Sequence, residues 1–516
     1  MASQLSLIGE QDVILSGNPT HTLWSSMWKR STLFSMENIQ QPFNGQAQIG
    51  TRCNVNISKN GDLLHNVFLQ MKLPDLRDFS INKQAVALQN TPVIISSRWT
   101  SSTQAKVKFL APTDNASSEF SVSVKDVNGN DITGQLSISD GGLHEKIIDG
   151  LVAPNTYTTT IVRDVDGAVS SEEKIVALRY ANAIGNASIK KVSLNIGGTM
   201  ITESSGEYFD IQSELEMSEE KLQGYNAMIC KYANYDLYDN SKQDAGTIFA
   251  PILFSFFKEP SSALPLISLA FHQIQLFFDF RSIFELIRSD VEVINLVDVN
   301  GRTPEQVMEM EMYATFVYLS QPERQRFLQA NQKLEYIFHD VQSVEVPLIV
   351  NQSNANLNKK INFSFTNPCQ ELIWIYRRNN GYNNAISPSE YATKGNDFFN
   401  YSLDGREIFD SAQIQINGVD RQSKRHQNYY RLMEPFLRHT RVPVDKDIFC
   451  FSFGLSPELL QPSGSLNLSR VERADLILTL SSAFTEAIHS GKITLFAKTL
   501  NILRIENGLA GTLFAA

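Results

Sequence analysis

The 516-residue chain is poor in cysteine and in charge, and it contains no long apolar run. Its cysteines, Cys53, Cys230, Cys369 and Cys450, lie far apart, which excludes a Cys-x-x-Cys metal or redox motif and favours reduced, mostly buried thiols. No stretch approaches the roughly 20 apolar residues of a membrane helix; the nearest, 264–280, is interrupted by polar side chains. The first residues lack the basic and apolar regions of a signal peptide, so we expect none, and we expect the Asn-x-Ser/Thr sequons to be chance matches.

The charge balance argues against a protein that coats nucleic acid. The net charge is −10, the isoelectric point is about 5.4, and only 19% of residues are charged. A protein that binds a genome without sequence preference needs a basic surface to neutralise phosphates, so we predict no direct contact with nucleic acid. Low charge combined with 31 phenylalanines suits β-rich layers with large buried faces.

The motifs of common enzyme classes are also missing. The chain has no G-x-x-x-x-G-K-S/T and no G-x-S-x-G, and His144-Glu145 does not continue as H-E-x-x-H. His272 stands alone at a predicted strand start, where a hydrogen-bonded structural role is the simpler interpretation. The basic run 421–426 invites a phosphate-binding interpretation, but in an acidic chain a solvated loop or an inter-subunit contact is favoured. His426 and His439 have no carboxylate at ligand spacing, so we predict no catalytic residue, no metal site and no cofactor.

Short alternating segments separated by turn residues predict an antiparallel β protein. Ile414 and Ile416 alternate with glutamines, and Asn417-Gly418 tolerates the positive φ of a tight hairpin turn. Asn60-Gly61 is expected to join two more strands, with no helix between them. The remaining strands are expected at 46–57, 64–73, 188–196, 249–257, 264–269, 272–278, 310–320, 334–338, 448–455, 466–470, 475–480 and 492–498. A strand-like run at 11–15, a helical segment at 214–232 and a short helix at 321–327 complete the prediction.

One ordered set of motifs between 412 and 470 carries the most specific information. Its residues are Asn417, Gly418, Asp420, Arg421, Tyr430, Arg431, His439, Thr440, Arg441, Pro443, Gln461, Pro462, Ser463, Gly464, Asn467 and Arg470, and the C-terminal segment adds Asn501, Arg504 and Gly508. This order resembles the major capsid proteins of nucleocytoplasmic large DNA viruses. The resemblance covers most of the chain except 75–187, and none of the motif residues forms a catalytic set.

The resemblance implies an all-β fold of two tandem eight-stranded antiparallel jelly rolls. It places an N-terminal arm at 1–30, a first jelly roll at 31–320 and a second at 321–516. The arm carries Trp24 and Trp28 at helical spacing. We expect it to pack beneath the first barrel, or against a neighbouring subunit or the membrane side.

Residues 91–180 differ in character and predict an inserted β-sandwich. They are rich in Ser, Thr and Val, with turn signals about every 8–12 residues. The segment 149–167 is similar to fibronectin type III repeats, although Trp99 lies too near the start of the segment for the usual tryptophan. We predict an immunoglobulin- or fibronectin-like domain that binds a host surface or a sibling capsid protein, or else one that is a decorative or stabilising insert.

The function implied by the resemblance is that of a structural major capsid protein. Three chains would form a pseudo-hexagonal capsomer that tiles the outer shell of a large icosahedral virion assembled in the host cytoplasm. Expected partners are further copies of the chain, minor capsid and penton proteins and, through a displayed insert, a host surface. The alternative is a jelly-roll protein of the virion surface that binds carbohydrate or a receptor as a small oligomer.

Overall fold

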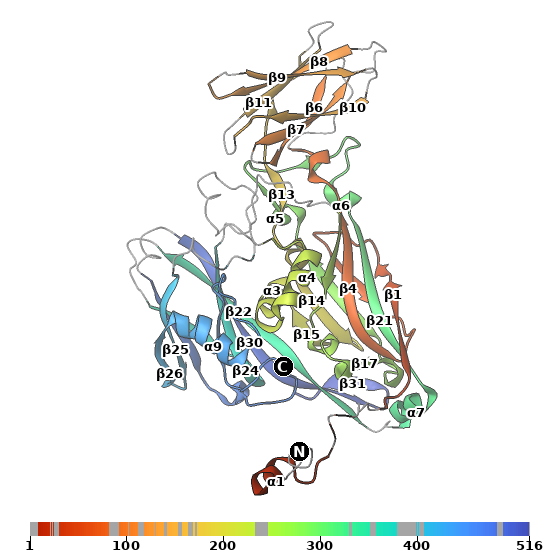
Figure 1. Ribbon diagram of the computed structural model, residues 1–516, viewed down its shortest axis with the longest axis vertical. Coiled ribbons are helices and arrows are strands. Elements are labelled where there is room, and N and C mark those ends of the chain that lie inside the picture. Colours follow the sequence, from red (N-terminus) through yellow and green to blue (C-terminus); the bar gives the residue numbers. More distant parts are fainter. Residues whose placement is uncertain are drawn as a thin grey trace, which may run out of the picture.

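Strands dominate the chain, and they form three groups of sheets. The computed structural model describes residues 9–20, 22, 24, 30–81, 92–101, 103–111, 118–128, 131–138, 142–152, 157–163, 169–170, 173–232, 246–329, 333–350, 358–378, 399, 401, 407–481 and 489–514. Figure 1 shows a body of two halves side by side, a smaller unit above the first half, and the N-terminal segment below. Every strand pair that forms these sheets is antiparallel, as the alternating sequence pattern predicted.

The first half is a sandwich of two sheets with five strands each. One sheet has the order β1-β21-β4-β16, with β17 beside β4, and the other has the order β15-β14-β18-β3-β2. The bounds are β1 Phe34–Gln41, β2 Phe43–Asn44, β3 Arg52–Asn56, β4 Leu63–Leu73, β14 Ile189–Ile196, β15 Thr199–Ser204, β16 Gly246–Pro251, β17 Leu264–Pro265, β18 Ile274–Phe280 and β21 Glu309–Leu319. Alternate residues of both sheets, such as Leu69 and Leu276, point inward and share one large core.

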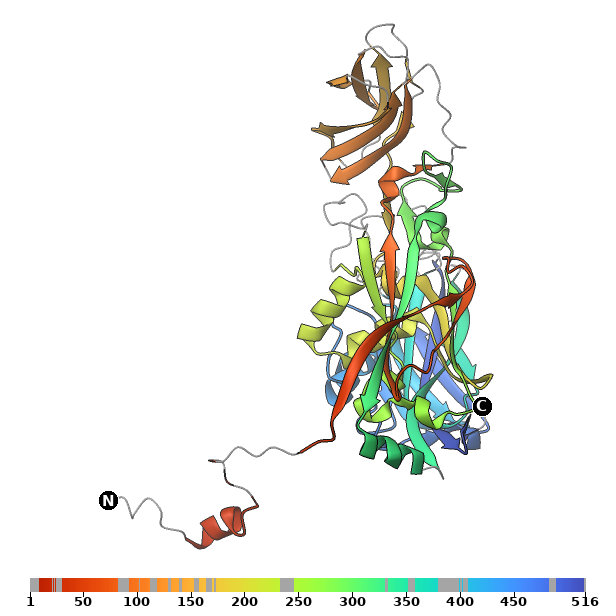
Figure 2. The same cartoon turned by 90° about the vertical axis from the view of Figure 1, so that its right-hand side faces the viewer.

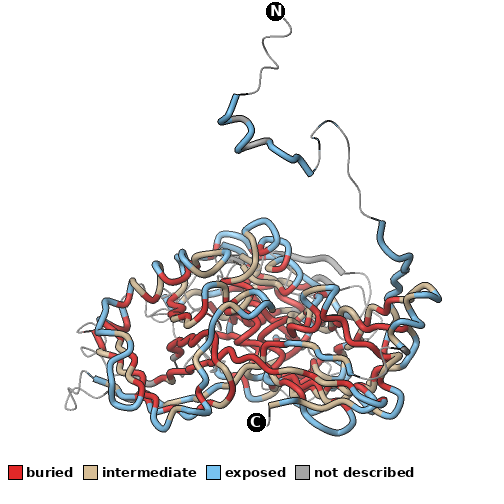
Figure 3. Tube along the Cα trace, turned by 90° about the horizontal axis from the view of Figure 1, so that it is seen from below, coloured by how far each residue is buried: buried red, intermediate tan, exposed pale blue. Residues whose placement is uncertain are grey.

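The second half repeats this arrangement with six strands facing four. The orders are β22-β30-β24-β27, with β28 on β24 and β31 on β30, and β23-β29-β25-β26. The bounds are β22 Leu334–Val350, β23 Asn358–Phe363, β24 Pro368–Arg378, β25 Phe409–Ile416, β26 Val419–His426, β27 Phe449–Ser452, β28 Leu466–Asn467, β29 Ala474–Leu480, β30 His489–Glu506 and β31 Leu509–Thr512. Trp374 is fully buried between these sheets, stacked on Phe449 and edge-on to Tyr430. Seen from below, buried chain fills the middle of both halves (Figure 3).

A third pair of sheets lies above the first half (Figure 1). Its orders are β10-β7-β6 and β12-β11-β8-β9, with β6 Val93–Ser101, β7 Gln104–Ala111, β8 Ser118–Asp126, β9 Asp131–Ile138, β10 Gly142–Asp149, β11 Tyr157–Arg163 and β12 Glu173–Lys174. These sheets enclose a separate core whose members all lie between Ile94 and Ala177. Trp99 is buried in this core, edge-on to Tyr157. Two short ladders below it, β5 Ser80–Ile81 with β20 Leu296–Val297 and β13 Leu178–Tyr180 with β19 Ile287–Ser289, lead back to the body.

Helices are short and, apart from α1, lie at the edges of the sheets or between the halves (Figure 1 and Figure 2). They are α1 Glu10–Ser16, α2 Ile184–Ser188, α3 Gly206–Glu216, α4 Glu219–Met228, α5 Ile283–Leu286, α6 Pro304–Val307, α7 Gln321–Gln329 and α9 Glu434–Arg438, with a π-helical turn η8 at Tyr429–Met433. The predicted helices at 321–327 and 214–232 correspond to α7 and to the C-terminal part of α3 with α4. Among the described residues, no helix has both the length and the apolar character needed to cross a bilayer.

Several predicted strands differ from the structure because tertiary contacts override local pattern. The Asn60-Gly61 segment does not form a hairpin, since β3 and β4 lie in opposite sheets of the first sandwich. The strand predicted at 249–257 ends at Pro251, and Ser255–Phe257 forms a 3-10 turn. The segment 264–269 contributes the two-residue strand β17 and then a 3-10 turn, Leu266–Ser268.

Two predicted strands near the second core are also shorter than expected. The strand at 448–455 ends at Ser452, and Leu455 is exposed. The strand at 466–470 ends after Asn467, whose side chain accepts a hydrogen bond from the Ser469 N–H at 3.1 Å and starts the 3-10 turn Leu468–Arg470. The basic run at 421–426, expected as a loop, belongs to the edge strand β26.

The described residues of the N-terminal arm, 9–20, 22, 24 and 30, do not pack beneath the first barrel (Figure 2). Figure 2 shows that α1 extends away from the body, with Ile14 and Trp24 exposed to solvent. The run at 11–15 is helical rather than a strand, because its amides bond along the chain, as in Gly17 N to Val13 O at 2.8 Å. Trp28 lies outside the described residues.

Candidate functional site

The helix α3 lies between the two halves (Figure 1), and four of its acidic side chains pair with basic residues of the second half. The helix begins where the Ser205 side chain accepts a hydrogen bond from the Tyr208 N–H at 3.2 Å. Gly206 is required at its first turn, because a Cβ there would meet the backbone carbonyls of Asn186 in α2 and Ile189 in β14. The acidic side chains are Glu207, Asp210, Glu214 and Glu216, all buried or nearly so.

Two of these carboxylates form a buried network with Lys231. The Lys231 ammonium contacts Asp210 and lies 2.7 Å from Glu214. Burial alone would raise the pKa of Glu214, but the charges of Lys231 and of Lys446 in the second half outweigh it and lower that pKa to about 2. Burial would likewise lower the pKa of Lys231, yet the two carboxylates raise it. Glu214 and Lys231 therefore stay charged at neutral pH, whereas burial raises the pKa of Asp210 despite the nearby lysines. Lys446 brings a residue of the second half into this network.

Arg441 of the His-Thr-Arg-Val-Pro motif reaches the same helix from the second half. Its guanidinium contacts Glu214 and donates to Glu219 at 2.7 Å, and its backbone N–H donates to Leu215 O at 3.0 Å. A cation at the C-terminal end of a helix also interacts favourably with the helix dipole. The motif thus caps α3 with both its backbone and its side chain.

A second buried pair crosses the junction at Glu216. Lys498 of β30 lies 2.5 Å from the Glu216 carboxylate, and Lys258 of the first half lies 2.9 Å from it. Burial alone would raise the pKa of Glu216, but the two lysine charges lower it well below its ordinary value. Lys258 also donates to Glu458 O at 2.7 Å, which adds a further link to the second half.

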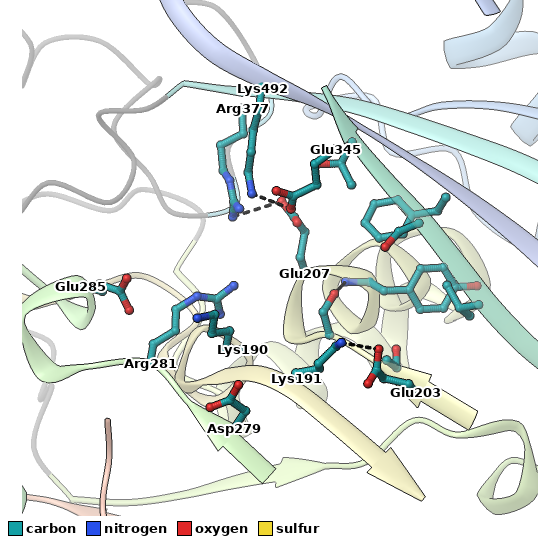
Figure 4. A pocket seen from close by; sticks show the side chains of 17 residues that line it. Lys190, Lys191, Glu203, Glu207, Asp279, Arg281, Glu285, Glu345, Arg377 and Lys492 are labelled. Atoms are coloured by element: carbon teal, nitrogen blue, oxygen red, sulfur yellow. Dashed lines mark hydrogen bonds and ion pairs between the residues drawn. The ribbon is translucent and has the colours of Figure 1, made fainter. Parts of the chain in front are cut away.

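A charged cavity of about 520 Å³ lies beside this junction, lined by both halves. Figure 4 shows Arg377 and Lys492 from the second half approaching Glu207 and Glu345, with Arg281 and the Lys191–Glu203 pair on the first-half side. Arg377 lies 3.0 Å from Glu207, and Lys492 lies 2.6 Å from Glu345. The lining of the cavity contains basic and acidic side chains in equal number. These groups neutralise one another, so the cavity does not have the charge of a site for one charged ligand.

The hairpin motif behaves as its sequence predicted. Asn417 and Gly418 have φ values of 52° and 76°, and they join β25 to β26. The side-chain oxygen Oδ1 of Asn417 accepts hydrogen bonds from the Glu472 and Arg473 N–H groups, both at 3.1 Å. Asp420 accepts from Gln415 at 2.7 Å across the hairpin, and Arg421 is exposed beside it. These residues fix the edge of the second sandwich.

The aromatic motif anchors the segment that leads to Arg441. Tyr430 is fully buried, and its hydroxyl donates to Ala412 O at 3.1 Å. Arg431 pairs with Asp447 at 3.1 Å and donates to Val444 O at 2.6 Å, and Pro443 is buried. Burial raises the pKa of Asp447 to about 6, although Arg431 opposes that shift. The segment is therefore held to the second core on both sides of the motif.

His439 and Thr440 bind two acidic residues, Glu371 and Glu458, that no sequence pattern links to them. His439 Nε2 lies 2.5 Å from Glu371, and its Nδ1 lies 3.1 Å from Glu458. The Thr440 N–H and hydroxyl donate to Glu458 at 2.7 and 2.6 Å. Burial opposes protonation of His439, but Glu371 outweighs it and raises the His439 pKa well above its ordinary value.

The remaining motif residues form turns on the surface. Ser463 bonds both backbone groups of Ser456, and Gly464, at φ 124°, packs against Gly454. Gln461, Pro462, Asn467 and Arg470 are exposed. The structure thus assigns no buried contact to these four.

The C-terminal motif ties the end of the chain to both halves. Asn501 bonds both backbone groups of Phe514, and Arg504 pairs with Glu335 at 2.9 Å. Gly508 O accepts from the Phe271 N–H at 3.2 Å in the first half. His272, predicted to be a structural histidine, accepts from the Ala510 N–H at 3.0 Å.

Sequence reasoning found the motif residues on the second half but missed their acidic partners on α3. Helical spacing was the available signal, because Glu207, Asp210 and Glu214 recur at intervals of three and four residues and share one face. Cys53, Cys369 and Cys450 are buried and Cys230 is half-buried, in line with the predicted buried thiols. The ion pairs and hydrogen bonds around α3 therefore form a fixed joint between the two sandwiches.

Comparisons with known proteins give major capsid protein families over most of the chain. The family described as large eukaryotic DNA virus major capsid protein matches residues 323–511, and the family described as major capsid protein N-terminus matches 22–101 and 154–320. The major capsid proteins of Phaeocystis pouchetii virus and of Paramecium bursaria Chlorella virus 1 are each 24% identical, over 99% of this chain and 99% of each relative.

Solved structures agree on the fold. The PBCV-1 virus capsid structure has a TM-score of 0.64 at 20% identity and covers 96% of this chain and 100% of its own. The Faustovirus major capsid protein has a TM-score of 0.62 at 14% identity and covers 97% of this chain and 94% of its own. The fold is therefore the double jelly roll of viral capsid proteins. The chain belongs to the major capsid protein family of large eukaryotic DNA viruses, and it is a structural protein of the virion rather than an enzyme.

Proposed function

We propose that three copies of the chain form a pseudo-hexagonal capsomer that tiles the outer shell of an icosahedral virion. The observation that carries this proposal is the joint between the halves, where buried ion pairs from α3 to Arg441, Lys446 and Lys498 hold the two sandwiches together. Two similar bodies held in this way give each chain two corners of a hexagon, and a three-fold axis supplies all six.

Each half is proposed to be a jelly roll with eight principal strands, at 31–320 and 321–516, preceded by an arm at 1–30. Apart from the short strands β2, β17, β28 and β31, the sheets of each half contain four strands facing four. This is the strand count of a jelly roll, in which two four-stranded sheets pack face to face. The motif residues from Asn417 to Gly508 are proposed to be structural, because they fix turns and the joint.

The copies are proposed to associate through two different apolar surfaces. A cyclic trimer needs a heterologous interface, in which one face of each chain meets another face of the next. Around α9 the side chains of Met433, Phe436 and Leu437 are exposed, and at β1 those of Phe34 and Met36 are exposed. Figure 1 shows α9 and β1 on opposite sides of the body, as a head-to-tail ring requires.

The unit at 91–180 is proposed to be an inserted immunoglobulin- or fibronectin-like sandwich on the outer surface of the shell. Its separate core and the gap between 101 and 154 in the family match support an insertion. It lies at the end of the molecule opposite the N-terminal arm (Figure 1). There it would contact a host surface or a neighbouring capsid protein, whereas minor capsid and penton proteins would contact the body during assembly in the host cytoplasm.

Light scattering coupled to size-exclusion chromatography tests the capsomer. A trimer of chains of 58.0 kDa has a mass of about 174 kDa. We expect this mass at micromolar concentration and a hexagonal outline by electron microscopy. A stable monomer, or a small oligomer that binds a glycan array, would contradict the proposal and favour the carbohydrate- or receptor-binding alternative.

A pair of matched variants tests the interface. Phe436→Asp with Leu437→Asp is expected to shift the trimer to monomer. Leu143→Asp with Ile147→Asp places the same charges on exposed residues of β10, outside the proposed interface, and should leave the trimer intact. Equal loss of trimer in both variants would contradict the assignment of the α9 surface.

A further inference from the structure

Three metal-binding side chains meet beneath the His-Thr-Arg-Val-Pro segment of the second half. A carboxylate oxygen of Glu371, a ring nitrogen of His439 and the sulfur of Cys450 all lie within 4.8 Å of one another. Glu371 lies on β24 and Cys450 on the paired strand β27, while His439 directly follows α9. The sequence pattern does not reveal this cluster, because Glu371 and His439 are 68 residues apart.

A fourth residue holds the histidine ring in the orientation that a metal ligand needs. Glu458 lies 3.1 Å from His439 Nδ1, and Thr440 fixes Glu458 in turn with two hydrogen bonds. Histidines that bind metals usually donate their other ring N–H to a carboxylate, which sets the tautomer and the ring plane. In this arrangement His439 Nε2 points toward Glu371, beside Cys450.

The cluster also leaves one buried polar atom without a partner. Glu371 is fully buried, and its Oε2 has no hydrogen-bond donor within the part of the chain that the structure describes. The Cys450 thiol is buried as well, and it contacts the His439 side chain directly and Tyr430 O at 3.8 Å. An unpaired carboxylate oxygen in the interior carries a large desolvation cost, which a bound cation would remove.

We propose that Glu371, His439 and Cys450 bind one zinc ion per chain, with Glu458 as the positioning residue for His439. A mixed set of carboxylate, imidazole and thiolate ligands suits zinc, whereas calcium and magnesium prefer oxygen ligands alone. The fourth position of the tetrahedron is available to Glu371 Oε2 or to water. This site is independent of the proposed trimer, since all of its ligands come from the second half of one chain.

The zinc ion would have a structural role. It would fasten residue 439 to the sheet of β24 and β27, two residues before Arg441 binds α3. Residue 440, which lies between them, is held by Glu458, whose backbone carbonyl accepts from Lys258 of the first half. The ion would thus stabilise the second core and the joint between the halves together.

Metal content of the full-length protein provides the direct test. The untagged protein, incubated with zinc and then desalted, is expected to retain about one zinc per chain, and chelation should lower its melting temperature. Replacement of zinc by cobalt should give a near-ultraviolet band from thiolate-to-cobalt charge transfer. Less than about 0.1 zinc per chain, or a cobalt spectrum without the sulfur band, would overturn the proposal whatever the behaviour of the variants.

Two cysteine variants identify the ligand. Cys450→Ser should remove the cobalt–sulfur band and weaken zinc binding at least about tenfold. Cys369→Ser is the matched control, because Cys369 is equally buried and lies on the same strand as Glu371 but outside the cluster. Glu458→Gln should weaken binding about 10–100-fold while it retains the band, as expected for a positioning residue. Full zinc retention by Cys450→Ser, or loss of the band in Cys369→Ser, would refute the ligand assignment.

Discussion

Removal of the Lys498 ammonium is the sharpest test of the joint between the halves. In Lys498→Met the carboxylate of Glu216 stays buried and loses its partner at 2.5 Å. The side chains of Lys498 and Glu216 are only 2% and 7% exposed, so water cannot replace the lost interaction. The apolar stem of methionine fills much of the volume of the lysine, which keeps the cavity small.

The expected cost follows from this burial. Breaking a buried ion pair by removing one partner usually costs about 3–5 kcal/mol. Lys258 still lies 2.9 Å from Glu216, and its side chain is partly exposed, so we expect the lower end of the range, about 3 kcal/mol. The double variant Lys498→Met with Glu216→Gln leaves no buried charge, and it should recover at least about 1 kcal/mol of that loss.

Urea unfolding followed by the fluorescence of buried Trp374 measures this effect in the second half. Lys72→Met is the matched control, because the Lys72–Glu309 pair spans 3.2 Å with side chains 64% and 68% exposed, and its loss should cost less than about 1 kcal/mol. The lysines lower the pKa of Glu216, so the stability from this pair is present above the ordinary value of 4.5 and is lost as the pH falls below it. Equal costs for Lys498→Met and Lys72→Met at neutral pH would refute the reasoning.

Three further predictions concern the turn at Gly197, the residue Asp290 at the base of the upper unit, and the upper unit at 92–176. Gly197→Ala should destabilise the protein by at least about 2 kcal/mol, because φ is 60° and the new Cβ would meet the His272 ring. Gly224→Ala is the control, since Gly224 lies in an exposed helical turn with open space around it, and this variant should stabilise the protein by about 0.5–1 kcal/mol. Burial raises the pKa of Asp290 to about 6, so its contribution to stability is complete below 3.8 and is lost as the pH rises through 6. Asp290→Asn should therefore raise the melting temperature at pH 7 relative to wild type but not at pH 4, and no change with pH would contradict this. Replacement of 92–176 by a flexible linker should remove one thermal transition and leave that of the body unchanged, because the two cores are separate, whereas loss of both transitions would contradict it.

Local features of the fold could be predicted from the sequence because neighbouring residues encode them. The hairpin at Asn417-Gly418 needs only two residues that tolerate positive φ between alternating strands, and it forms as predicted. The charged segment after Ser320 forms the helix α7 because its proline lies near the first helical position, where the missing N–H is harmless. The ordered motifs from 412 to 470 pointed to the family, and they lie within the residues 323–511 that its family model matches.

The joint between the halves was decided only by the tertiary structure. Arg441 and Glu214 are 227 residues apart, and Lys498 and Glu216 are 282 apart, so no local pattern reports that they meet. The same holds for Asn60-Gly61, which has the composition of a hairpin turn but links two opposite sheets. The sequence by itself determined most of the strands and the Asn417-Gly418 turn, because short-range sterics and alternation suffice for these, and its ordered motifs pointed to the family. Only the tertiary structure determined which charged side chains pair in the buried joint. A charged group is buried only where the fold brings its partner from a distant strand or helix into contact with it.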